Sequence, residues 1–180
     1  MAIRSRKRGW RHLLVLALFG FYLLAVLDAI FFPILIPENW PANLNTAETV
    51  RALHQVNWIP FHFGSVADSA AYPGANLRHI QWFDIIGNIL LTIPLGLGMT
   101  YFRRMDFKHT LWLALAVGLL LEGTQLIIKL ILGVYYHAVD INDVIWNALG
   151  VLLGFGIFQM WVYIRRSWES HKNIKNLPLS

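Results

Sequence analysis

The chain has 180 residues, of which 57% are apolar and 14% are charged, and its formal net charge is +5. A soluble domain usually has about 45–50% apolar and about 25% charged residues, so this composition excludes an ordinary soluble domain. The sequence contains no cysteine, which excludes disulfide bonds and thiolate chemistry. These properties indicate an integral membrane protein.

Four apolar stretches are long enough to cross a hydrocarbon core of about 30 Å, which requires roughly 17–25 helical residues. We place them near Leu13–Ile36, Trp82–Phe102, Thr110–Leu132 and Asn142–Ile164. The stretches lack the alternation of apolar and polar residues that is typical of barrel strands, so we expect helices. The predicted fold class is an all-α, polytopic membrane protein with a bundle of four transmembrane helices.

The first apolar stretch follows the basic segment Arg4–Arg8, and this order is also that of a signal peptide. Its hydrophobicity continues past Asp28 and Pro33, and no cleavage site of small residues follows, so we expect an anchor that is retained. The predicted organisation is a basic N-terminus (1–12), a membrane domain (13–164) with a long loop at 37–81, and a C-terminal tail (165–180).

The long loop 37–81 contains the pattern of a short interfacial helix. Asn45-Thr-Ala-Glu48 resembles a capping box, and Val50, Leu53 and Val56 would then share one face of the helix. The aromatic segment Asn57–Phe61 follows, and its composition suits the boundary between lipid and water. Two interpretations are open for this region, an interfacial anchor and a lid across the membrane domain.

Lysine and arginine residues are distributed unevenly about the predicted spans. The N-terminal flank, the loop after the second span and the C-terminal tail hold twelve of the 15, whereas loop 37–81 holds only Arg51 and Arg78. The positive-inside rule therefore predicts that both termini are cytoplasmic and that the long loop is extracytoplasmic. We attribute the basic charge to this topology and to anionic lipid, and we expect no nucleic-acid partner.

Ionisable and amide side chains lie within or at the ends of the last three spans. A charge in the hydrocarbon core costs roughly 2.5–3.5 kcal/mol on insertion scales, so such side chains normally face a partner or a hydrated cavity. Helical spacing places each set on one stripe of its helix. The eight polar residues are Asp84, Asn88, Glu122, Gln125, Lys129, Asp140, Asp143 and Asn147. With the orientation above, all of them lie in the outer half of the bundle, and this placement predicts an outward-open polar cavity.

Three further residues concern the packing of these spans. Gly150 and Gly154 form a G-x-x-x-G pair, which permits close contact between helices. Pro94 is expected to break or kink the second span. For the three amide side chains among the polar residues, an interhelical hydrogen bond worth about 0.6 kcal/mol is an alternative to a functional role.

Four sequence blocks resemble those of the VanZ-like membrane proteins. The blocks are Asn57-Trp-Ile-Pro-Phe61, Asn88–Gly96, Glu122-Gly-Thr-Gln125 and Asp140–Gly154, and the last contains the most specific pattern, Asp-x-x-Asp-x-x-x-Asn-x-x-Gly. The resemblance implies a bacterial cell-envelope protein in the cytoplasmic (inner) membrane. The family takes its name from a protein associated with resistance to the glycopeptide antibiotic teicoplanin. Members usually carry arginine where this chain has His137, and histidine does not offer the bidentate fork of arginine.

Two classes of function fit these residues. In the first, Glu122, Asp140 and Asp143 are catalytic and act on a membrane lipid, a lipid-linked precursor or a cell-wall substrate, with Asp140 and Asp143 as candidate ligands of a divalent cation. The alternative is a non-enzymatic protein that binds lipid or ions, transports a solute or serves as an accessory subunit. For transport, a homo-oligomer could complete a permeation path across the membrane. In either class the candidate binding residues are Asn57, Asp84, Asn88, Gln125, Lys129, His137 and Asn147.

A specific pairing is expected within this polar cavity. Lys129 lies about 10 Å from Glu122 along the helix axis, close to the level of Asp140 and Asp143. We therefore predict that Lys129 pairs with these two aspartates. Glu122 would then be held by neighbouring amides or by water.

Overall fold

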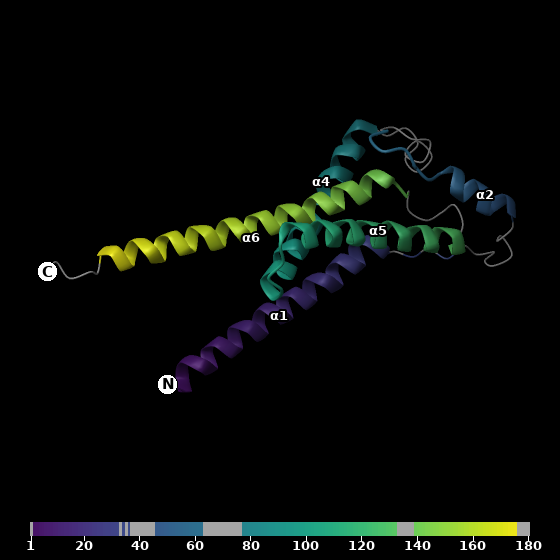
Figure 1. The fold of residues 1–180 in the computed structure, drawn as a ribbon. Helices are drawn as coiled ribbons and strands as arrows, with labels where there is room; N and C mark the ends of the chain where they lie inside the picture. Colours follow the sequence, from purple (N-terminus) through teal and green to yellow (C-terminus); the bar gives the residue numbers. More distant parts are fainter. Residues whose placement is uncertain are drawn as a thin grey trace.

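The computed structural model describes residues 2–32, 34, 36, 46–62, 77–132 and 139–175. This part of the chain contains the helices α1 (Ala2–Phe31), α2 (Thr46–His54), α4 (Leu77–Phe102), α5 (Phe107–Leu132) and α6 (Ile141–Lys175), arranged as in Figure 1. The long helices α1, α4, α5 and α6 each contain a segment that is long and apolar enough to cross a membrane. The predicted all-α fold with four membrane-spanning helices is therefore confirmed.

The helices depart from the predicted spans in several places. Helix α1 ends at Phe31, before the expected Ile36. The cause is the proline at position 33, because a proline disfavours helical geometry in the residue that precedes it. Helix α4 is continuous across Pro94, so of the expected break or kink the break does not occur. Helix α6 continues to Lys175, well beyond the predicted Ile164.

Helix α6 occupies the centre of the packing. It lies against both α4 and α5, whereas α1 contacts α4 at the periphery (Figure 1). The small buried core contains Leu95 of α4, Ala114 of α5, and Ala148 and Val151 of α6. The α1 side of the bundle is fixed in part by Tyr22, whose hydroxyl donates a hydrogen bond to the carbonyl of Leu91.

Helices α4 and α6 approach each other through glycines. A methyl group added at Gly96 would overlap the backbone carbonyl of Val151, and one added at Gly154 would overlap the carbonyl of Ile93. At Gly150 it would meet the hydroxyl of Thr92, a group that also donates a hydrogen bond across the interface to the carbonyl of Asn147 at 2.9 Å. The close contact predicted from the G-x-x-x-G pair is therefore confirmed.

A polar cap defines the start of α5. The carboxylate oxygen Oδ1 of Asp106 accepts a hydrogen bond from the backbone N–H of His109 at 2.8 Å and lies 2.6 Å from Nδ1 of the same histidine. The backbone hydrogen bond, followed by the bond from the imidazole, holds the pKa of Asp106 below its usual value of 3.8. The N-cap explains why α5 begins at Phe107, three residues before the predicted Thr110.

The short helix expected in the long loop is present as α2, which packs against α5. Its apolar side chains are buried unevenly. Ala52 and Val56 are buried, whereas Val50 and Leu53 are exposed, at 46% and 38%. Of the three apolar residues expected to share one face, only Val56 is therefore covered by the rest of the described structure. The capping residue Asn45 lies outside the described residues.

Candidate functional site

The turn after α2 is joined to the start of α6 by a short stretch of paired backbone. The backbone N–H of Asn57 donates to the carbonyl of Val139 at 3.0 Å, and the N–H of Ile141 donates to the carbonyl of Asn57, also at 3.0 Å. These bonds form an isolated parallel bridge between Asn57 and Asp140. Two of the candidate residues, 83 positions apart in the chain, are thereby held side by side.

The side chain of Asn57 strengthens this connection. Its amide nitrogen lies 3.0 Å from each carboxylate oxygen of Asp140 and also donates to the carbonyl of His62 at 2.9 Å. Asn57 is only 6% exposed, so its amide is removed from water and depends on these partners. The amide therefore holds both the turn and the carboxylate in place.

A second asparagine fixes the far end of the same turn. Oδ1 of Asn142 accepts a hydrogen bond from the backbone N–H of Phe61 at 2.6 Å, and its backbone N–H donates to Oδ1 of Asp140 at 2.7 Å. Phe61 has a φ of 60°, an unfavourable conformation for a bulky residue. Backbone of this kind persists only where neighbouring contacts impose it, and here Asn142 and the ring contact with Trp146 do so.

Four carboxylates converge where α4, α5 and α6 meet this turn. The backbone N–H of Asp140 donates to Oε2 of Glu122 at 3.3 Å. Asp143 accepts a hydrogen bond from the side chain of Asn88 and lies within electrostatic range of Glu122, Asp140 and Asp84. Glu122 is 6% exposed, whereas Asp84 is exposed. The cluster therefore extends from the buried face of α5 to the surface of α4.

The remaining candidate residues are placed less uniformly. The side-chain amide of Gln125 donates to the carbonyl of Ile30 at 3.3 Å, so it connects α5 to α1. Lys129 is 2% exposed and is among the largest buried side chains in the described structure. Asn147 lies one turn beyond Asp143, and its Oδ1 is buried without a hydrogen-bond partner in the described part of the chain. His137 lies outside the described residues.

The chemistry of the cluster is that of closely spaced acids in a region poor in water. Ionised carboxylates repel one another strongly at low dielectric, so a bound cation, a cationic ligand group or a shared proton would stabilise them. Among the residues that the structure describes, no three histidine, aspartate or glutamate side chains have the arrangement of a metal site. The oxygens of Asp140 are moreover engaged by Asn57 and Asn142.

Sequence reasoning did not identify Asn142, which is 2% exposed and central to the turn. The sequence signal at this helix start concerns Asp140, which caps the backbone N–H of Asn142 in an Asx turn, and it does not predict the bond from Phe61 to the Asn142 side chain. Thr92 was also missed, although it bonds to the carbonyls of Asn88 and Asn147. A threonine within an apolar span carries a weaker signal, since its hydroxyl commonly bonds within its own helix.

Comparison with known proteins assigns the chain to a family. The model of the VanZ/LLP1 family matches residues 10–162, which include the turn after α2 and the carboxylate cluster. No curated protein and no solved structure matches the chain significantly.

Proposed function

Because the chain belongs to the VanZ/LLP1 family, we propose that it is a bacterial cell-envelope membrane protein that binds a lipid-linked or cell-wall substrate through its carboxylate cluster. In this proposal Glu122, Asp140 and Asp143 supply acid–base groups, and Asn57, Asn88 and other polar residues of the cluster orient the ligand. The link between the family and glycopeptide resistance supports a substrate from cell-wall metabolism in this proposal.

The observation that carries the proposal is the position of Asp143. It accepts a hydrogen bond from Asn88 and interacts electrostatically with three further carboxylates. Burial of several acids together is costly, and structural packing alone gains little from it. The unsatisfied Oδ1 of Asn147, one turn away, adds a buried acceptor that a ligand donor or water would satisfy. These features support a binding site more than a purely structural interface.

The proposed orientation places the cluster on the extracytoplasmic side, where cell-wall precursors are processed. It rests on the distribution of lysine and arginine about the spans. Since the natural chain has no cysteine, single cysteines at Gln55 and Ser180 can be labelled in intact cells with an impermeant maleimide. Labelling at position 55 alone is expected. Labelling at position 180 in intact cells would contradict the orientation.

Native mass spectrometry of the detergent-purified protein tests the binding proposal. The probes are a polyprenyl-diphosphate-linked cell-wall precursor and, as an ordinary anionic lipid for comparison, phosphatidylglycerol. Wild-type protein is expected to retain the precursor, and Asp143→Asn is expected to lose it. The matched control is Asp28→Asn, because Asp28 is an exposed carboxylate within a membrane-spanning helix, on α1.

Melting curves of the same samples separate loss of binding from loss of fold. If Asp143→Asn is unstable, Asn88→Ala replaces it, since it removes the hydrogen bond to Asp143 and retains all four carboxylates. Equal retention of the precursor by folded wild-type protein and by both cluster variants would refute the proposal. An equal loss of precursor binding in the control variant Asp28→Asn would also refute the proposal.

A further inference from the structure

The C-terminal part of α6 continues beyond the other helices. The helix has 35 residues, which corresponds to about 52 Å at a rise of 1.5 Å per residue. A hydrocarbon core measures about 30 Å, and the bilayer with its headgroups about 40–45 Å. If α6 enters the hydrocarbon core near Ile141, it leaves the core near Trp161, and the next two turns lie among lipid headgroups. Figure 1 shows this end of the helix, in yellow, apart from the bundle.

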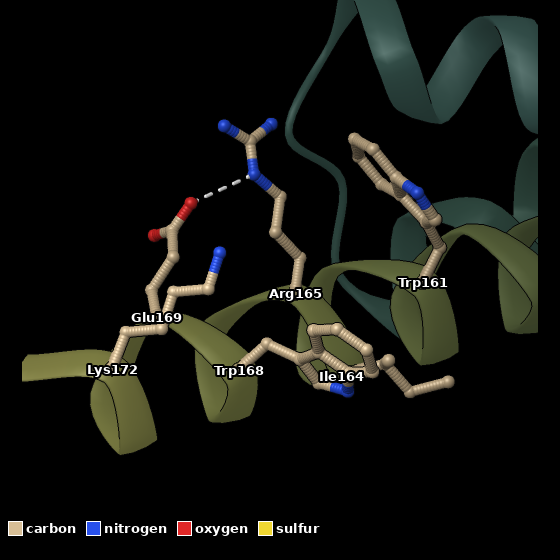
Figure 2. Close-up of a pocket in the computed structure, with 6 residues that line it drawn as sticks. All are labelled: Trp161, Ile164, Arg165, Trp168, Glu169 and Lys172. Atoms are coloured by element: carbon tan, nitrogen blue, oxygen red, sulfur yellow. Dashed lines mark hydrogen bonds and ion pairs between the residues drawn. The ribbon is translucent and has the colours of Figure 1, made fainter. Parts of the chain in front are cut away.

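One face of these turns combines aromatic and charged side chains. The spacing i, i+3, i+4, i+7, i+8 and i+11 places six residues on the same side of the helix. They line a shallow groove (Figure 2) formed by Trp161, Ile164, Arg165, Trp168, Glu169 and Lys172. We call this surface the α6 groove. The two tryptophans are 51% and 69% exposed, although indole rings are among the most costly side chains to leave in water.

The charges of the α6 groove are ordered by contacts within the helix. Nε of Arg165 lies 3.0 Å from Oε1 of Glu169, and the guanidinium carbon lies 5.7 Å from the centre of the Trp161 ring. Figure 2 shows the terminal nitrogens of Arg165 pointing away from the helix. Arg165 and Lys172 outnumber Glu169 in the groove, and the exposed Arg166 lies next to it in the helix, so this surface has an excess of positive charge.

We propose that the α6 groove binds the phosphate groups of anionic phospholipids in the adjoining leaflet. Tryptophan and tyrosine concentrate at the level of headgroups, and arginine and lysine beside them attract anionic lipid. A second copy of the chain is a poorer occupant, because it would bring the same excess of positive charge to the contact. The α6 groove therefore sets the depth of α6 in the bilayer, independently of the carboxylate cluster at the other end of the helix.

The depth of the groove in a membrane can be measured with a spin label at Ser167→Cys, because the chain has no other cysteine. Ser167 lies beside Trp168, and its side chain makes no hydrogen bond within the described structure. The full-length protein is reconstituted into phosphatidylcholine alone and into phosphatidylcholine mixed with phosphatidylglycerol. Collision of the label with a water-soluble nickel reagent is expected to fall when phosphatidylglycerol is present.

Two double variants identify the residues responsible. Arg165→Gln with Lys172→Gln is expected to lose the effect of phosphatidylglycerol. Arg103→Gln with Arg104→Gln, which removes two exposed cations from the loop after α4, is expected to retain it. Equal collision rates in the two membranes would overturn the proposal, as would an effect that persists in the groove variant. Spin–spin broadening in the wild-type background would show a second copy on the α6 groove and would also overturn it.

Discussion

Removal of the Asn57 amide tests how strongly the turn after α2 is held against α6. Asn57→Ala deletes a hydrogen bond shared between the two oxygens of Asp140 and a second one to the carbonyl of His62. A hydrogen bond to a charged group contributes about 1.5–3 kcal/mol and a neutral one about 0.5–1.5 kcal/mol. The free energy of local opening should therefore fall by about 2–4 kcal/mol.

Hydrogen exchange measures this local opening directly, whereas the melting of the whole bundle need not report it. The relevant amides are those of Asn57, Phe61 and Ile141, which are bonded across the junction. Because about 1.4 kcal/mol corresponds to a factor of ten, their exchange should accelerate by about 30- to 700-fold. Mass spectrometry of peptides that cover the turn and the start of α6 provides the assay.

Gln55→Ala is the matched control, since it removes a similar amide two residues away. The side chain of Gln55 makes no hydrogen bond in the described part of the chain, so exchange should stay close to that of the wild type. The reasoning is refuted if Asn57→Ala exchanges at the wild-type rate. It is also refuted if Gln55→Ala accelerates exchange equally, because the effect would then belong to the turn in general.

Three further outcomes are expected. Gly154→Ala should lower the stability of the purified protein by about 1–3 kcal/mol, because the added methyl group overpacks the contact with α4. Gly156→Ala is the control and should leave the stability unchanged, since a methyl group there meets nothing within 4 Å. Equal melting temperatures of the two variants would contradict the expected overpacking. Folding lowers the pKa of Asp106, so the stabilisation of α5 by this cap is complete above the unfolded pKa and is lost as the pH falls through the folded pKa. Asp106→Ala should therefore remove the acidic part of the pH dependence of hydrogen exchange at the start of α5. An unchanged pH dependence in this variant would exclude the cap. Glu122→Gln should preserve the melting temperature, because the new amide oxygen can still accept the hydrogen bond from the backbone of Asp140. Lys129→Ala should lower the stability by about 2 kcal/mol, because it removes a buried side chain. A stable Lys129 variant together with a destabilised Glu122 variant would refute both of these expectations.

The fold was predictable from hydropathy because the cost of exposing backbone and apolar side chains in lipid leaves few alternatives to long helices. The ends of the helices were less predictable. Helix α6 passes its apolar segment and continues through polar residues, supported by local contacts such as that between Arg165 and Glu169. Average hydropathy locates the apolar span, predicted to end at Ile164, but it does not register such contacts and so does not give the end of the helix at Lys175.

The arrangement of the candidate site was predictable only in part, since helical spacing gives the face of a helix but not its neighbour. The stripes grouped Asn88, Glu122 and Asp143, and the structure places these three residues in one electrostatic cluster. Gln125 shares the stripe of Glu122, yet it bonds to α1 because a glutamine side chain is long enough to reach either side. The bridge between Asn57 and Asp140 joins distant parts of the chain, and no local pattern specifies it.

The contact between α4 and α6 has a consequence for synthesis of the protein. Thr92 and Asn147, which meet across this contact, are 55 residues apart. At about 5–20 residues per second, roughly 3–11 s pass between their emergence from the ribosome. During this interval α4 carries Asn88 and the glycine surface of Gly96 without the helix that later covers them. The contact that packs α4 in the finished fold therefore forms only after α6 has been synthesised.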